Sequence, residues 1–370
     1  MKIKYILMWL KKEMVMTIAV VLAIFASCYQ LPKLSYIDGR VLIILFNLML
    51  IIAAFRHYEL LDFLALSLMK YCRSFKMAGI ILTSLTFVAA MFMTNDVALL
   101  TFVPLMMILG RKLEEKTLKW VVFQTLAANL GSALTPMGNP QNLYIFTHYG
   151  IGIGSFLKVT SILLILGALF MGVLFLLEKG HSLTIDMNQG EIRNPKKLIG
   201  FGVLFVIVLA SVVRYIDYRI AFVLVIVYTA IVQRELFRKV DYTLLITFIG
   251  FFIFVGTLGE VPTVKVFLEG LLSRKGNTYL SGLLLSQVIS NVPATMLLAS
   301  FTNNWQELVL GVNIGGLGTL IASLASVISY KLYTAEFPEE QGKFMKCFTI
   351  YNVIGLVSMG LIASAFVFFV

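Results

Sequence analysis

Charged side chains are scarce in this sequence: Asp, Glu, Lys and Arg make up 13% of its 370 residues, whereas 59% are hydrophobic. With a mean hydropathy of +0.93, such a chain cannot bury its apolar surface around one soluble core. The 3 cysteines and 3 histidines lack the spacing of a disulfide framework or metal site. Nucleophile elbows, phosphate-binding loops and dinucleotide fingerprints are also missing. These absences predict a membrane protein that is not an enzyme and has no organic cofactor.

Long apolar segments are abundant instead. A helix needs about 20 apolar residues to cross a bilayer. The sequence predicts an all-α polytopic membrane protein with about nine spanning helices, near residues 14–30, 41–56, 118–147, 155–177, 198–213, 219–233, 243–258, 305–330 and 344–369. Two further apolar stretches, 77–110 and 276–302, are predicted to be re-entrant hairpins.

The net charge of +11 is explained by where the basic residues lie. If the N-terminus is cytoplasmic, most of them fall in inside loops, as the positive-inside rule requires. The basic residues left outside are Lys33, Arg40, Lys158, Arg214, Arg219, Lys265, Arg274 and Lys275. We therefore expect the bilayer of a bacterial inner membrane, and no nucleic acid, as the partner of this chain. The N-terminus should be cytoplasmic and the C-terminus outside.

Following the chain through this charge map predicts an inverted duplication, in which the second half repeats the first upside down. Each hairpin is preceded by a stretch suited to lying in the membrane interface, 57–76 or 260–275. Inverted repeats place the substrate where they meet. The predicted divisions are a first repeat 1–177 (hairpin 77–110, broken helix 118–147), a cytoplasmic loop and linker helix 178–218, and a second repeat 219–370 (hairpin 276–302, broken helix 305–330).

Both hairpins have a polar tip: Thr94-Asn95-Asp96 in the first and Ser290-Asn291-Val292-Pro293 in the second. The first hairpin's legs, 77–93 and 97–109, would be about 25 and 20 Å long at 1.5 Å per residue, short of the ~30 Å hydrocarbon core. The tip should therefore stop inside the membrane, where its polar residues can cap the returning helix. The alternative is a simple turn at the far surface.

The segment 118–147 contains LAANLGSALTPMGNPQNLYIF and cannot be one continuous helix, because glycine and proline interrupt it. Asn139-Pro140 restarts it as a cap followed by a first-turn proline. Asn129, Ser132 and Thr135 should line the break, and the helix N-terminus there suits an anion. In 305–330, glycines surround Asn313 in the same way, although glycines in membrane helices also serve close packing.

Asp96 is the acid most clearly placed at membrane depth. Burying its charge unpaired would cost at least ~2.5 kcal/mol, so it must bind a cation, find a partner or carry a proton. We predict that it belongs to a coupling-ion site. The alternative is a permanently satisfied helix cap.

The runs TNDVALLTFVPL, ANLGSALTPMGNPQNL and ISNVPATMLLA, with the Asn313 segment in the expected order, carry a resemblance over nearly the whole chain. The chain resembles the anion-permease branch of the ion transporter superfamily, which includes arsenite permeases, NhaD-type sodium/proton antiporters, citrate transporters and divalent anion/sodium symporters. It is most similar to short, uncharacterised bacterial inner-membrane permeases. The resemblance implies two re-entrant hairpins and two broken helices around a central site, often in a homodimer that works by an elevator-like movement.

The resemblance also implies ligand positions, to which Thr135 and Asn139 of the first break are added. The candidate substrate-binding residues are Asn95, Asn129, Ser132, Thr135, Asn139, Asn291, Thr295 and Asn313. The candidate coupling-ion residues are Thr94, Asn95, Asp96, Gly131, Ser290, Asn291 and Gly315, with Na⁺ at the hairpin tips as one form of that site. The sequence departs from the sodium-coupled dicarboxylate members, which carry Ser-Asn-Thr at both tips.

We therefore expect a secondary active transporter of a small anion or oxyanion, a carboxylate or an arsenite-like species, coupled to H⁺ or Na⁺. The alternative is a sodium/proton antiporter in which Asp96 exchanges the two cations and no anion moves. A membrane-embedded enzyme or receptor would require a catalytic pair at membrane depth, and the sequence offers none.

Overall fold

The computed structural model describes residues 13–70, 72–179 and 191–369. Every regular element in this part of the chain is a helix, which confirms the all-α class. The basic N-terminal segment, and residues 180–190 of the predicted cytoplasmic loop and linker helix 178–218, lie outside the described residues.

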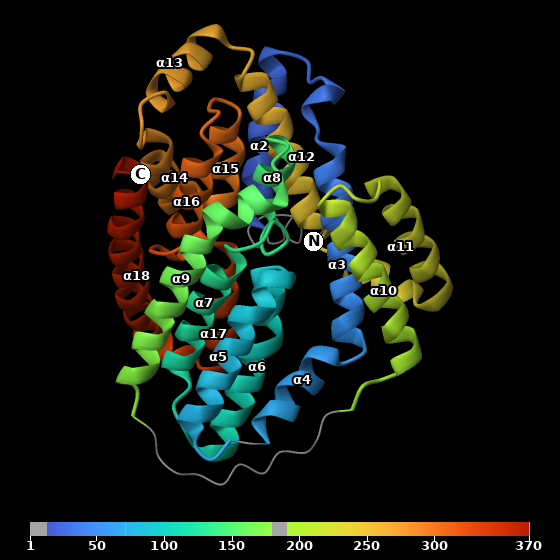
Figure 1. The fold of residues 1–370 in the computed structure, drawn as a ribbon, viewed down its shortest axis with the longest axis vertical. Helices are drawn as coiled ribbons and strands as arrows, with labels where there is room; N and C mark the ends of the chain where they lie inside the picture. Colours follow the sequence, from blue (N-terminus) through green and yellow to red (C-terminus); the bar gives the residue numbers. More distant parts are fainter. Residues whose placement is uncertain (1–12, 71, 180–190, 370) are drawn as a thin grey trace, which may run out of the picture.

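Figure 1 shows the helices in chain order. Their bounds are α2 Met14–Tyr29, η1 Leu34–Tyr36, α3 Gly39–His57, α4 Leu60–Met69, α5 Phe75–Phe92, α6 Asn95–Leu113, α7 Leu118–Ser132, α8 Pro140–His148, α9 Ile153–Leu177, α10 Pro195–Val212, α11 Tyr218–Val232, η2 Arg234–Lys239, α12 Tyr242–Leu258, α13 Pro262–Leu272, α14 Asn277–Ile289, α15 Asn291–Ala299, α16 Trp305–Gly315, η3 Leu320–Ala322, α17 Leu324–Glu336, η4 Pro338–Glu340 and α18 Gln341–Phe369.

Side-chain caps fix the starts of several apolar helices. Asp38 accepts a hydrogen bond from Val41 N at the start of α3, and Asp241 accepts one from Leu244 N at the start of α12. Such caps satisfy amides that would otherwise be free at a helix N-terminus. Their polar side chains also mark where an apolar helix can begin.

Five helices in the described residues are long and apolar enough to cross a membrane, and a sixth span results if α12 and α13, bent by 99°, are joined. The chain is therefore a polytopic membrane protein. The remaining predicted spans are split or short: α7 has 15 residues and α8 has 9. The figure of about nine spans stays a prediction.

The two hairpins occupy opposite halves of the long axis, α5–α6 below and α14–α15 above, with both tips directed toward the middle (Figure 1). Helix α13 lies at one end of this axis and α4 toward the other. The breaks predicted within 118–147 and 305–330 are present, since α7 ends at Ser132 before α8, and α16 ends at Gly315 before α17.

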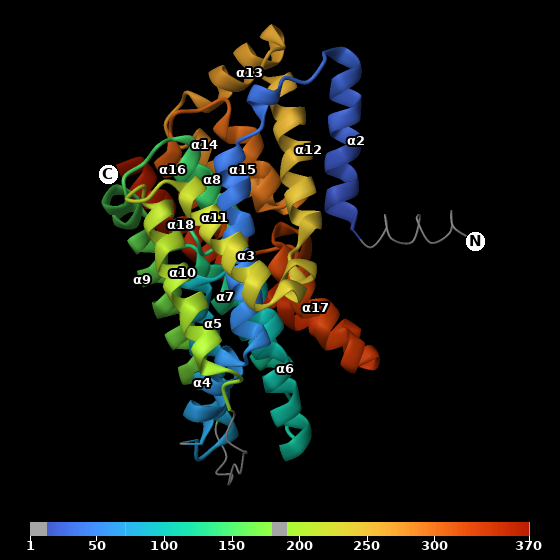
Figure 2. The same ribbon diagram turned by 90° about the vertical axis from the view of Figure 1, so that its right-hand side faces the viewer.

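Helix contacts in one half recur in the other with the partners exchanged. Helix α2 packs against α12 while α11 packs against α3; α5 packs on α7 as α14 does on α16; α6 contacts α17 as α15 contacts α8. Figure 2 shows the α2–α12 pair, and α17 beside α6. This exchange is what an inverted repeat would produce, although the predicted domain bounds themselves remain a prediction.

The legs of the first hairpin are longer than the sequence predicted. Helices α5 and α6 have 18 and 19 residues, or roughly 27 and 28 Å. Ser74 caps α5 earlier than expected, by accepting a hydrogen bond from Met77 N. Helix α6 continues through Arg111 and Lys112, whose charges suit a helix C-terminus. Legs of this length nearly match the hydrocarbon core, so leg length does not support a re-entrant tip. The position of the tips is judged instead from the residues that they contact.

Candidate functional site

The first hairpin tip contacts the break between α7 and α8. The backbone N–H of Asn95 donates to the carbonyl oxygen of Gly138 at 3.2 Å. Its side-chain Nδ2 donates to Oδ1 of Asn129 at 3.1 Å, and both asparagines are 5% exposed. The start of α6 is thus attached to both sides of the broken helix.

The second tip contacts the break between α16 and α17. Ser290, which has a φ of 74°, donates from Oγ to the carbonyl oxygen of Ala322 at 3.4 Å. A Cβ added to Gly316 would come within 2.9 Å of Nδ2 of Asn291. Each tip therefore lies against the broken helix of its own half.

Gln287, near the end of α14, secures the second break. Its Nε2 donates to the carbonyl oxygens of Gly315 at 2.7 Å and Leu317 at 3.0 Å, and its Oε1 accepts from Thr319 N at 2.9 Å. One side chain thereby holds backbone on both sides of Gly316 in place.

Two clusters of buried amides join the halves of the chain. In the first, Asn129 Oδ1 accepts from Asn95 and also from Oγ of Ser323 at 2.9 Å. In the second, Asn139 Nδ2 donates to Oδ1 of Asn313 at 3.0 Å, and Asn313 Nδ2 donates to Oδ1 of Asn142 at 2.7 Å. Buried amides of this kind fix a unique arrangement, because any shift leaves several of them unsatisfied.

Helix capping at the tips differs from the prediction. Thr94 and Ser290 occupy the N-cap positions of α6 and α15, and neither forms a side-chain cap. The hydroxyl of Ser290 is directed instead to Ala322. The predicted cap at Asn139 is confirmed, because its Oδ1 accepts from Asn142 N at 2.8 Å with Pro140 following. The start of α15 therefore keeps partial positive charge that no side-chain cap offsets. At the start of α6, Asn95 Oδ1 accepts from Asp96 N, and the Asp96 carboxyl lies in the first turn.

The candidate hydroxyl residues divide into two kinds. Ser132 belongs to the second amide cluster, since its Oγ accepts from Asn139 Nδ2 at 3.2 Å. The hydroxyls of Thr135 and Thr295 donate to backbone carbonyls, of Met91 and Asn291 respectively. Thr94 is 7% exposed. The structure thus brings Asn95, Asn129, Ser132, Asn139 and Asn313 into the clusters, whereas Thr135 and Thr295 satisfy nearby backbone.

Sequence reasoning did not select four residues that the structure places beside the candidates: Asn142, Gln287, Ser323 and Ser326. Each is a polar side chain in or next to an apolar helix. A buried polar residue in an otherwise apolar segment is the signal that could have identified them.

Gly131 and Gly315 allow close helix packing. A Cβ on Gly131 would lie 2.0 Å from the carbonyl oxygen of Phe87 in α5, and one on Gly315 would lie 2.8 Å from Cβ of Ser286 in α14. Neither position has room for a side chain. This close approach holds each break against the first leg of the hairpin in its own half, α5 or α14.

Gly131→Ala should therefore lower the midpoint of thermal unfolding, with a cost of about 1–3 kcal/mol or more for overpacking. The control is Gly172→Ala in α9, where an added Cβ meets nothing within 4 Å. Thermal unfolding of the purified proteins, followed by size-exclusion chromatography, measures both. Equal stability of the two variants would contradict the packing role of Gly131.

Asp96 has an unusual environment. Its Oδ1 is buried and has no hydrogen-bond partner among the described residues. Its backbone N–H donates to Oδ1 of Asn95 at 3.0 Å, and none of the ion pairs in the described part of the chain includes it. A buried carboxylate oxygen without a partner is suited to binding a cation or a proton.

Over residues 13–70, 72–179 and 191–369, no group of three or more His, Cys, Asp or Glu side chains is placed to hold a metal ion. Asn95 Oδ1 is an amide oxygen in contact with the backbone of Asp96, and the carboxylate of Asp241 is close enough to interact electrostatically with the Asp96 side chain. Backbone carbonyls of broken helices coordinate Na⁺ in secondary transporters.

Comparisons with known proteins show what the chain is similar to. The profile of the citrate transporter family matches residues 4–305. An uncharacterized transporter of Methanocaldococcus jannaschii is 33% identical over 362 residues, covering 96% of this chain and 97% of the relative. The inner membrane protein YbiR of Escherichia coli is 31% identical over 301 residues, 80% of each chain. An uncharacterized transporter of Mycobacterium bovis is 25% identical over 332 residues, covering 79% of this chain and 77% of the relative.

Proposed function

Because the chain belongs to the citrate transporter family and is a membrane transporter of the anion permease type, we propose that it is a secondary active transporter of a small anion. The substrate class is a carboxylate or an arsenite-like oxyanion, and the driving ion is H⁺ or Na⁺. One observation carries the proposal: each hairpin tip contacts the helix break of its own half, and buried amides join the two breaks across the halves.

The anion is proposed to bind between the two tips. Helices α6 and α15 both begin there. The N-terminus of α15, which has no side-chain cap, offers partial positive charge and backbone amides to an anion. The first N–H groups of α6 already donate to Gly138 O, Asn95 Oδ1 and Thr94 O. Asn95, Asn129, Asn291 and Asn313 supply amide donors beside them, and each is 5% exposed or less. No lysine or arginine is required, which suits a substrate that must also leave.

The driving ion is proposed to bind at the first tip, with Asp96 as the residue that gains or loses the cation. Its unpartnered Oδ1 is also the observation that favours the second candidate function, a sodium/proton antiporter. Both functions need this carboxylate. They differ in whether an anion moves with it.

We further propose that 1–177 and 219–370 form an inverted repeat in an inner membrane, with the N-terminus cytoplasmic and the C-terminus outside. The exchanged helix contacts support this, as does the similarity to an inner membrane protein of Escherichia coli. The hairpins and broken helices would move together past the remaining helices in an elevator-like step. A homodimer would supply the fixed scaffold.

Purified protein in proteoliposomes should accumulate labelled citrate or another labelled carboxylate when an inward H⁺ or Na⁺ gradient is imposed. A tenfold gradient of one coupled ion is worth ~1.4 kcal/mol, so one-to-one coupling should support about tenfold accumulation. Uptake is measured by filtration, with arsenite as a parallel substrate. Vesicles without protein, and vesicles with the gradient collapsed, are the controls.

The antiporter replaces this proposal if no anion moves while an imposed Na⁺ gradient alone drives proton flux, read with an internal pH dye.

A further inference from the structure

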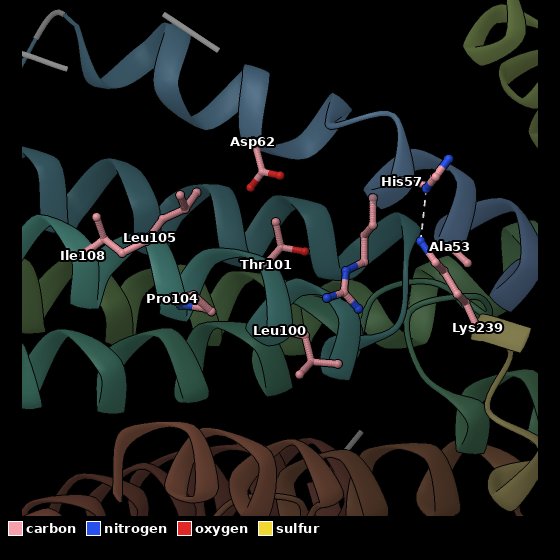
Figure 3. A pocket seen from close by; sticks show the side chains of 10 residues that line it. Ala53, His57, Asp62, Leu100, Thr101, Pro104, Leu105, Ile108 and Lys239 are labelled. Atoms are coloured by element: carbon pink, nitrogen blue, oxygen red, sulfur yellow. Dashed lines mark hydrogen bonds between the residues drawn. The ribbon is translucent and has the colours of Figure 1, made fainter. Parts of the chain in front are cut away.

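A cleft of about 490 Å³ lies between α3, α4 and α6, and η2 closes one end of it (Figure 3). This volume is within the ~300–1,000 Å³ typical of small-molecule sites. The cleft is separate from the two amide clusters. Its lining comprises Ala53, Arg56, His57, Asp62, Leu100, Thr101, Pro104, Leu105, Ile108 and Lys239.

One end of the cleft is basic. Lys239 Nζ lies 3.1 Å from Nδ1 of His57, so the ammonium donates and the imidazole accepts through an unprotonated Nδ1. The remaining ring proton is then on Nε2, which can donate to a ligand. Arg56 is exposed and forms no ion pair among the described residues. Arg56, His57 and Lys239 therefore place three hydrogen-bond donors at this end of the cleft, and the Arg56 and Lys239 side chains are positively charged.

Asp62 is the acidic side chain in the lining. Burial raises the pKa of Asp62, and the neighbouring Glu59 raises it further, while Arg56 lowers it. The raised pKa reduces the cost of protonating this carboxyl when an anion approaches. The balance of fixed charge in the cleft remains positive.

The wall formed by α6 leads toward the first hairpin tip. Leu100 and Thr101 line the cleft one helical turn after Asp96, and the lining continues to Ile108, about 12 Å farther along the helix. Most of this wall is apolar. A ligand in the cleft would therefore lie on the approach to the coupling acid, along the returning leg of the hairpin.

A second cleft, of about 300 Å³, is formed by η1, α8, α12 and α15. In the proposed inverted repeat, α12 corresponds to α3 and α15 corresponds to α6. In the same way, η1 precedes α3 as η2 precedes α12. Its lining includes Asp38, Tyr144 and His148 but no lysine or arginine. The basic character is thus particular to the first cleft.

We propose that the α3–α4–α6 cleft is a second anion-binding site, which holds a soluble carboxylate or phosphate on its way to or from the hairpin tips. It lies on the cytoplasmic side in the proposed orientation. Anion binding in the cleft depends only on Arg56, His57 and Lys239. Its role in transport rests on the proposed function. An anionic lipid headgroup shares the same chemistry and is the other source to be tested.

The test uses thiol protection in the full-length protein. Cys28, Cys72 and Cys347 are replaced with alanine, Leu105→Cys places a thiol in the cleft, and its alkylation by N-ethylmaleimide is timed. Citrate and inorganic phosphate should slow alkylation. Arg56→Gln and Lys239→Gln should each weaken this protection about tenfold, since each removes a charge-assisted contact. Asp62→Asn should strengthen it.

Arg238→Gln is the matched control, because it removes the same charge from the neighbouring position of η2 outside the lining. Arg56→Lys should retain protection, which guards against misfolding as the cause of any loss. Equal weakening by Arg238→Gln, or no protection by either anion, overturns the proposal. So does protection by phosphatidylglycerol in phosphatidylcholine vesicles with none by soluble anions.

The same measurement separates this site from the transport proposal. Protection should persist in an Asn313→Ala background, because Asn313 does not line the cleft. If soluble anions protect the thiol but the parent protein takes up no anion, the cleft proposal stands and the transport proposal fails. If the parent protein takes up anion but soluble anions do not protect the thiol, only the cleft proposal fails.

Discussion

Replacing Asn313 with alanine should reduce anion uptake at least ~100-fold, the loss expected when binding groups are displaced by about 1 Å. Asn313 connects the two halves: its Oδ1 accepts from Asn139, and its Nδ2 donates to Asn142 and to the carbonyl oxygen of Val309. The alanine variant leaves these buried partners unsatisfied, at about 1–3 kcal/mol each. Initial uptake rates in proteoliposomes measure the effect.

Asn352→Ala is the matched control. Asn352 is also fully buried, and its Nδ2 donates to the carbonyl oxygen of Phe348 at 2.9 Å within α18. The substitution Asn352→Ala removes the same amide group, but from a helix that contributes to neither a hairpin tip nor a helix break. We expect uptake close to that of the parent protein. A comparable loss in both variants would indicate general destabilisation and would contradict a specific role for Asn313.

A double-mutant cycle between Asn139 and Asn313 tests the contact itself. If their hydrogen bond joins the halves, the free energies of unfolding for Asn139→Ala and Asn313→Ala should be non-additive, with a coupling of about 0.5–3 kcal/mol. Thermal or denaturant unfolding of the four proteins supplies the values. Additive effects would mean that the two amides act independently.

The helix breaks were predictable because local chemistry decides them. Pro136 and Gly138 close together disfavour a continuous helix, and Asn139-Pro140 restarts one, so the interval between α7 and α8 could be placed within a few residues. The glycines around Asn313 gave the end of α16 for the same reason. These features depend on near neighbours in sequence, which a single sequence contains.

The partners of these residues were not predictable, because they depend on contacts between distant segments. Ser323 joins Asn129 across 194 residues, and Asn142 joins Asn313 across 171. A serine within GTLIASLAS gives no sign of which helix it will face. The hairpin ends were also misplaced, since hydropathy falls at Arg111 whereas α6 continues to Leu113.

Asp96→Asn should abolish gradient-driven accumulation while anion exchange continues. Asparagine keeps the size and polarity of the side chain, and removes its charge and its ability to exchange a proton. If the driving ion binds at Oδ1, the parent's accumulation of about tenfold per tenfold ion gradient should fall to simple equilibration. Uptake under a gradient and counterflow of labelled anion, measured in the same vesicles, distinguish loss of coupling from loss of binding.

Asp217→Asn is the control for this substitution. Asp217 is exposed and accepts a hydrogen bond from Arg219 N at the start of α11, and asparagine caps helices equally well. Its accumulation should match that of the parent. The decisive comparison is pH dependence: an Asp96→Asn protein that accumulates anion normally at every pH has no coupling role at this position. Asp96 Oδ1 would then be only a buried oxygen without a hydrogen-bond partner in the first turn of α6. The driving ion would have to bind elsewhere among the tip residues.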